Sequence, residues 1–84
     1  MKRVYYIAEV SYNEEIHEWC LIGDPMDTPC KTLGNAVKLA EAMGATKAFS
    51  FNEHGERKVI MNHHYEFADG TTEDVQEMVY RCEY

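Results

Sequence analysis

The chain has 84 residues, of which 45% are hydrophobic and 12% aromatic, and its formal net charge is −7. This length suits one domain with a small core, and the hydrophobic share is too high for a disordered chain. No apolar run approaches the roughly 20 residues that span a membrane, and the start MKRVYYIAEV lacks the long apolar core of a signal peptide. We therefore expect one domain over residues 1–84, located in the cytosol.

The first predicted element is a β-hairpin. Apolar and polar residues alternate over residues 3–12, which is typical of a strand. Tyr5 and Ile7 interrupt the polar side, so the second face of this strand is not purely solvated. Residues 13–14, Asn-Glu, suit a tight turn. Residues 16–22 are then the return strand.

A helix is predicted next, after a loop over residues 24–31 that contains both prolines. Thr32 is a good N-cap, because its hydroxyl can accept a hydrogen bond from the first turn. The apolar residues at helical spacing are Leu33, Ala36, Val37, Ala40 and Met43. Gly44 is expected to end the helix. One apolar stripe cannot bury itself, so the helix must pack on the sheet.

A second hairpin follows the helix. Residues 46–52 alternate again and predict a strand. The turn is expected in NEHGER, where Gly55 can supply the positive φ that a short hairpin loop requires. The return strand is predicted over residues 57–67, and residues 69–70, Asp-Gly, end it.

The C-terminal segment fits two structures. As a helix, it would be capped by Thr71 with Asp74 three residues on, close to a capping box. Its apolar stripe would be Val75, Met78, Val79 and Cys82. As a strand, residues 78–84 alternate equally well. Side-chain propensity slightly favours the helix.

The predicted fold class is therefore α+β: a small antiparallel sheet of about four strands, with one or two helices packed on one face. The element order is ββαββα, or ββαβββ if the last element is a strand. An antiparallel sheet tolerates one uncovered face in either order.

Cysteine and histidine residues do not form a recognisable site. Cys20, Cys30 and Cys82 are an odd number without a CxxC spacing, which favours free thiols; a Cys20–Cys30 bridge is the alternative. His63 and His64 are neighbours on a strand, so they point to opposite faces and cannot easily share a metal. GxGxxG, GxxxxGK[ST], HExxH and GxSxG are all absent. We expect no metal, no cofactor and no catalytic residues, hence a protein that is not an enzyme.

Acidic residues are concentrated in two tracts. Residues 9–27 contain six acids, no Lys or Arg, and Trp19, the one tryptophan of the chain. Residues 59–84 contain six acids and one Arg. Such tracts are repelled by phosphate backbones and anionic membranes, and attracted by basic surfaces. An aromatic platform of Tyr5, Ile7 and Trp19 would lie among these acids, which disfavours direct nucleic-acid binding. Solubility alone is the simplest explanation of an acid excess.

The leading hypothesis is a small acidic, non-enzymatic binding protein. It would inhibit a larger nucleic-acid-processing complex by occupying its basic groove, by imitating the phosphates of nucleic acid. Anti-CRISPR proteins and other small acidic inhibitors of host defence are analogous in size, charge and compactness, without a shared motif. The predicted partner-binding residues are the acids Glu14, Glu15, Glu18, Asp24, Asp27, Glu73, Asp74 and Glu77, with Tyr5 and Trp19 as aromatic anchors.

Two other functions remain open. The first is a structural or scaffolding module that self-associates as a homodimer, through an edge strand or an open sheet face. The second is a protein that sequesters a metal ion or a small ligand. For Trp19, packing in the core is the alternative to a role as an interface anchor.

Overall fold

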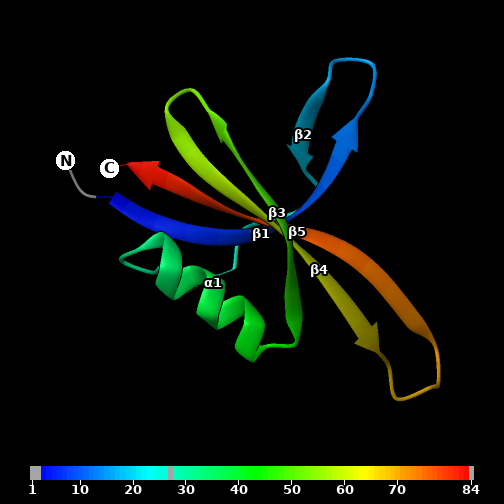
Figure 1. Cartoon of the computed structure of the whole chain (residues 1–84). Helices are drawn as coiled ribbons and strands as arrows, with labels where there is room; N and C mark the ends of the chain where they lie inside the picture. Colours follow the sequence, from blue (N-terminus) through cyan, green and yellow to red (C-terminus); the bar gives the residue numbers. More distant parts are fainter. Residues whose placement is uncertain (1–2, 27, 84) are drawn as a thin grey trace.

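The computed structural model describes residues 3–26 and 28–83, which form one antiparallel sheet and one helix (Figure 1). The elements are β1 (Arg3–Asn13), β2 (Glu18–Leu21), α1 (Leu33–Ala42), β3 (Ala45–Glu53), β4 (Glu56–Glu66) and β5 (Thr72–Glu83). The order across the sheet is β2-β1-β5-β4-β3, so the last strand lies between the first and the fourth. Within the described ranges, no helix is long and apolar enough to cross a membrane.

The predicted fold class is wrong, because the described residues are mostly β, with five strands and a single short helix instead of a ββαββα arrangement; their order is ββαβββ, the predicted alternative. The decisive segment is β5. It pairs with β1 on one side and with β4 on the other, through eight residue pairs each. Three consecutive residues, Glu77, Met78 and Val79, are buried. A central strand is covered on both faces, and this pairing overrides the weak helical propensity of the segment.

The turn before β5 shows why no helix starts there. The carboxylate of Asp69 accepts hydrogen bonds from the backbone N–H of Thr71 at 3.0 Å and from its hydroxyl at 2.6 Å. The backbone N–H of Phe67 donates to the carbonyl of Thr71, and Gly70 has φ of 88°. Thr71 is therefore part of a tight hairpin turn and does not cap a helix.

Helix α1 covers one face of the sheet, which we call the helix face. The hydroxyl of Thr32 accepts a hydrogen bond from the backbone N–H of Asn35 at 3.1 Å, which confirms the predicted N-cap. Gly44 follows the helix with φ of 103°. Two small residues, Ala36 and Ala40, are fully buried, so the helix lies close to the sheet. The sheet residues beneath it are Ile7, Ala45, Val59, Met61 and Val79.

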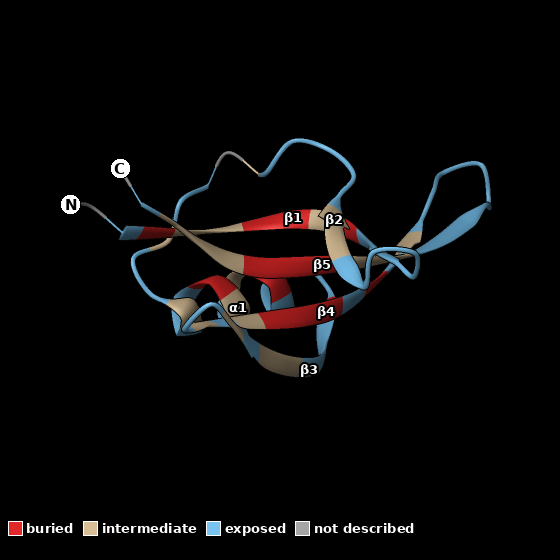
Figure 2. Cartoon of the chain, turned by 90° about the horizontal axis from the view of Figure 1, so that it is seen from above, coloured by how far each residue is buried: buried red, intermediate tan, exposed pale blue. Residues whose placement is uncertain are grey.

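The opposite face, which we call the curled face, is covered by the sheet itself. Trp19 on edge strand β2 and Phe49 on edge strand β3 have ring centroids only 6.0 Å apart, although three strands separate them in the sheet. The twist of the strands thus brings the two edges together. Val10, Ile60 and Met78 form a second buried hydrophobic cluster on this face, and Trp19, Phe51 and Tyr80 pack against it. Buried segments of β1, β5 and β4 run through the middle of the molecule in Figure 2.

The loop after β2 protects the outer edge of β1. The backbone N–H of Met26 donates to the carbonyl of Ile7 at 2.9 Å, and Tyr5 and Cys30 exchange two backbone hydrogen bonds. Tyr5 is half-buried on the helix face and Ile7 is buried, whereas Trp19 packs on the curled face. The platform of Tyr5, Ile7 and Trp19 considered above therefore does not form. The three cysteines are free.

Candidate functional site

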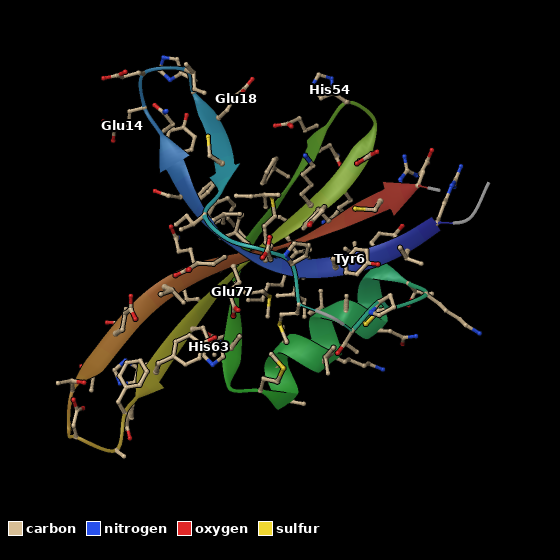
Figure 3. The ribbon with its side chains drawn as sticks, turned by 180° about the vertical axis from the view of Figure 1, so that it is seen from behind. Tyr6, Glu14, Glu18, His54, His63 and Glu77 are labelled. Carbon is tan, nitrogen blue, oxygen red and sulfur yellow. The ribbon has the colours of Figure 1, made fainter. Side chains whose placement is uncertain are left out.

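Two acidic hairpins leave the sheet at the same end and diverge from each other (Figures 1 and 3). The pairing of β1 with β5 stops at Val10 and Gln76. Beyond this pair, β1 continues only with β2, and β5 continues only with β4. The exposed acids of the β1–β2 hairpin are Glu14, Glu15 and Glu18, and those of the β4–β5 hairpin are Glu66, Asp69, Glu73 and Asp74.

The ion pairs of Lys and Arg lie elsewhere. Within the described residues they are Lys58–Glu53 at 3.0 Å, Arg81–Glu56 at 2.9 Å, Arg81–Glu83 at 3.3 Å and Arg3–Glu83 at 3.4 Å. All of them involve the β3–β4 hairpin or the ends of β1 and β5 near the termini, at the other end of the sheet. The projecting parts of the two hairpins, residues 11–21 and 62–75, contain no Lys or Arg. Their carboxylates therefore produce a negative field that no Lys or Arg of the same projecting parts offsets.

The remaining predicted partner-binding residues have different surroundings. Asp24 is exposed in the loop beside β1, and Asp27 lies outside the described residues. Glu77, expected at an exposed position, is only 5% exposed because β5 is a central strand. Trp19 is half-buried, with its ring 5.2 Å from that of Tyr12 in an edge-on arrangement. Its packing therefore belongs partly to the core and partly to the surface.

A groove opens on the helix face, beyond the helix, toward the β4–β5 hairpin. It has a volume of about 250 Å³ and is lined by Glu9, Tyr65, Phe67, Glu73, Val75 and Glu77. We call it the acidic–aromatic groove. The rings of Tyr65 and Phe67 are nearly parallel, with centroids 6.4 Å apart and an interplanar angle of 16°. This site was not predicted from the sequence, although His63 and Tyr65 of β4 and Phe67, directly after it, alternate along the chain and so share one face.

A buried histidine–glutamate pair lies beside this groove. The distance from His63 Nδ1 to Glu77 Oε1 is 2.7 Å, and the Tyr65 hydroxyl donates to Glu77 Oε2 at 3.5 Å. With Glu77 ionised, its carboxylate can only accept, and the imidazole then donates from Nδ1. The Nε2 atom of His63 faces Gly44: a Cβ atom added to Gly44 would lie 3.5 Å from it. Burial, and then the charges of Glu77, Glu9 and Glu73, raise the pKa of Tyr65 above its usual value.

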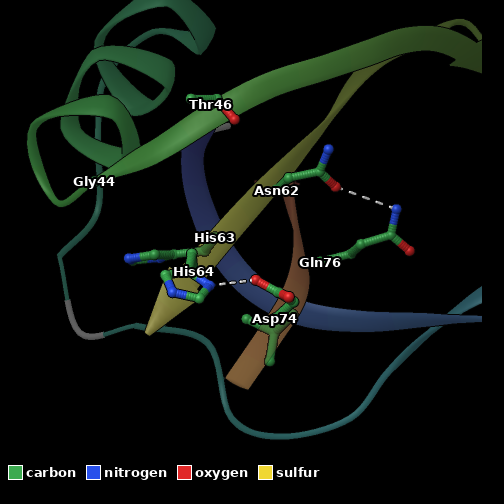
Figure 4. Close-up of a pocket in the computed structure, with 8 residues that line it drawn as sticks. Gly44, Thr46, Asn62, His63, His64, Asp74 and Gln76 are labelled. Carbon is green, nitrogen blue, oxygen red and sulfur yellow. Dashed lines mark hydrogen bonds and ion pairs between the residues drawn. The ribbon is translucent and has the colours of Figure 1, made fainter. Parts of the chain in front are cut away.

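A second histidine pair lies in a polar pocket of about 440 Å³ between the start of β3 and the β4–β5 hairpin (Figure 4). His64 Nδ1 is 2.6 Å from Asp74 Oδ1, and His64 Nε2 is 3.6 Å from Glu66 Oε1. The hydrogen bond with Asp74, followed by the charge of Asp74, raises the pKa of His64. Gln76 Nε2 also donates to Asn62 Oδ1 at 3.5 Å.

The chemistry available to these two pairs is limited. His63 and His64 contact different carboxylates, as predicted from the alternation of side chains along a strand. A carboxylate that orients an imidazole is a common element of general bases. The residues lining the polar pocket, however, provide one hydroxyl, that of Thr46, and no thiol. Within the described ranges, no group of three or more His, Cys, Asp or Glu is arranged to hold a metal ion.

Comparisons of the chain with protein-family models, with curated proteins and with solved structures gave no match. A function for this protein is therefore argued from the placement of its charges, rings and cavities.

Proposed function

We propose that the protein is a small, acidic, non-enzymatic binding protein of the cytosol that inhibits a larger nucleic-acid-processing complex by occupying its basic groove. One observation carries this proposal: the exposed carboxylates of the two hairpins lie at one end of the sheet, while the ion pairs of Lys and Arg lie at the other end. Negative charge is thus directed toward one side of the molecule.

The hairpins suit the role of charge carriers because their turns are held in place. Asn13 Oδ1 accepts a hydrogen bond from the backbone N–H of Glu15 at 3.0 Å, and Asp69 fixes the β4–β5 turn in the same manner. Carboxylates on such turns keep their spacing, as phosphates do along a nucleic-acid backbone. A partner groove lined by Arg and Lys would be reached by electrostatic steering, which is effective over a Debye length of about 8–10 Å at physiological salt.

The test is capture of partners from a host-cell lysate with this chain as bait, washed first at low and then at raised salt. We expect recovery of a nucleic-acid-binding complex that dissociates as the salt concentration rises. The double variant Glu14→Lys with Glu15→Lys should weaken capture by about tenfold or more, because it reverses two charges on one hairpin.

Glu41→Lys is the control for the single variant Glu14→Lys, because both reverse one charge, and Glu41 is exposed on α1 and belongs to neither hairpin. Equal effects of reversal at Glu14 and at Glu41 would mean that only net charge matters. Capture that is indifferent to both salt and charge reversal would contradict the proposal.

Self-association is a second candidate, favoured by exposed apolar side chains near the edges of the sheet. Tyr12 is 43%, Phe49 45% and Leu21 49% exposed. Contact between two copies through these residues would be little affected by salt, unlike binding through the acidic hairpins. Sizing at low and at high salt distinguishes the two functions: a dimer that persists in high salt, without capture of a basic partner, favours self-association.

A further inference from the structure

The acidic–aromatic groove combines two chemical features that recognise an organic cation. Glu9, Glu73 and Glu77 surround it with carboxylates, and its lining includes no Lys or Arg to neutralise them. Tyr65 of β4 and Phe67, just after β4, contribute two nearly parallel rings. Phe67 is 47% exposed, a large apolar side chain left open to a partner. Aromatic faces attract cations, and carboxylates accept their hydrogen bonds.

We propose that this groove is a subsite for an arginine side chain of the basic partner. The planar guanidinium stacks on the rings of Tyr65 and Phe67, and the carboxylates of Glu9 and Glu73 accept its N–H groups. This inference rests on the proposed function, since the arginine belongs to the basic surface that the acidic hairpins engage.

Glu77 has a different part in this subsite from the two more open acids. It is buried, and its two oxygens already contact His63 and the Tyr65 hydroxyl. The Tyr65 ring is held by stacking on His63, with ring centroids 3.9 Å apart, and Glu77 orients His63 and adds negative charge at the floor of the groove. Glu9 is half-buried and Glu73 is exposed, so their oxygens are the ones that a partner can reach.

Arginine fits this groove better than lysine for a geometric reason. The guanidinium is flat and weakly hydrated, so it can lie against a ring and direct several N–H groups outward in its plane. A lysine ammonium is a compact, strongly hydrated point charge that would satisfy the carboxylates but gain less from the rings. Rings and carboxylates lining one groove therefore select the flat cation.

The experiment is an NMR titration of the full chain with N-acetyl-arginine amide. The lysine and the citrulline analogues serve as controls, because citrulline keeps the shape of arginine without its charge. We expect the arginine compound to shift the ring signals of Tyr65 and Phe67, with an affinity at least about threefold higher than that of the lysine compound. The citrulline compound should cause no comparable shifts.

Two pairs of variants locate the binding. Phe67→Ala should weaken arginine binding about threefold, whereas Phe49→Ala, which removes an equally exposed ring from the curled face, should leave it unchanged. Glu73→Gln should weaken it, whereas Glu66→Gln, on the same hairpin, should have little effect because Glu66 does not line the groove. Equal effects within either pair, equal binding of arginine and lysine, or shifts centred on Glu14 and Glu15 would overturn the assignment.

The two proposals fail in different ways. If arginine shifts Tyr65 and Phe67 but reversal of Glu14 and Glu15 does not change partner capture, the groove stands and the groove-blocking function fails. If capture depends on salt and on these two acids but not on Phe67, the function stands and the arginine subsite fails.

Discussion

The two faces of this sheet bury their apolar side chains by different means. The helix face is covered by an added layer, with Ala36 and Ala40 of α1 packed on the strands. The curled face has no such layer, and its buried side chains are covered by Trp19, Phe51 and Tyr80 of the sheet itself, with Trp19 and Phe49 bringing the two edges together. Neither the helix nor the aromatic side chains extend over the whole sheet. The acidic–aromatic groove lies where the helix stops, and exposed rings lie where the two edges meet. The surfaces available to a partner are therefore the parts of the sheet that neither the helix nor these aromatic side chains cover.

The largest expected effect compares the cores of the two faces. Ile60 and Met61 are neighbours on β4, both are 0% exposed, and they point to opposite faces. We expect Ile60→Ala and Met61→Ala each to lower the free energy of unfolding by about 3 kcal/mol, measured by urea denaturation. If the curled face were open to water, Ile60→Ala would cost much less than Met61→Ala, and that result would contradict the covered cluster. Ile60→Val, expected to cost about 1 kcal/mol, serves if the alanine variants do not fold.

A smaller effect separates the acid that supports the fold from the acids that face solvent. Glu77→Ala removes the acceptor of the buried His63 and should cost about 2 kcal/mol of stability, because an unpaired buried polar group is unfavourable. Glu73→Ala, on the same strand and the same face, should change stability by no more than about 0.5 kcal/mol. The measurement is again urea denaturation. Equal costs would mean that the His63–Glu77 pair contributes nothing specific to the fold.

Local signals in the sequence predicted the local structure well. The strands of the first hairpin, the Thr32 cap, the end of the helix at Gly44 and the positive φ of Gly55 are confirmed. Each of these depends on a few neighbouring residues. A cap needs one hydroxyl, and the two-residue turn after β3 needs a left-handed backbone at His54 and Gly55, two neighbouring positions.

The last strand was predicted only as the alternative to a helix, for a physical reason. A strand buried on both faces has consecutive apolar residues, and Val75, Met78, Val79 and Cys82 also match the spacing of a helical stripe. Only pairing with β1, almost the whole chain away, makes this segment central. The same long-range pairing buries Glu77. The Asp69-Gly70 dipeptide was the one local indication of a hairpin.

In the candidate site, too, local features could be predicted from the sequence and long-range arrangement could not. Both acidic tracts could be identified from the sequence, because they depend only on amino-acid composition. Their position at one end of the sheet depends on strand order, and so does the distance of Lys58 and Arg81 from them. The groove depends on β1, β4 and β5 together, which explains why its rings were not recognised as a site.

The smallest expected effect concerns His64, on the curled side of β4. Asp74, and to a lesser degree Glu66, raise its pKa above the ordinary value of 6.5. A raised pKa in the folded state stabilises the fold below pH 6.5, and this contribution is lost as the pH rises through the raised value. Asp74→Asn should return the NMR titration midpoint of His64 toward 6.5 and remove this pH dependence. An unchanged midpoint would show that Asp74 does not stabilise the protonated imidazole of His64.

The same proton affects binding in the opposite direction. A protonated His64 offsets part of the negative charge on the β4–β5 hairpin, so attraction to a basic groove is weaker when the ring is charged. As the pH rises through the raised pKa, the hairpin becomes slightly less stable and more negative. Partner capture should therefore strengthen modestly over the pH interval in which the fold loses this contribution. In Asp74→Asn, the pH dependence of stability should largely disappear and the rise in partner capture should move to lower pH with the midpoint of His64. Together these two results would link both effects to one residue.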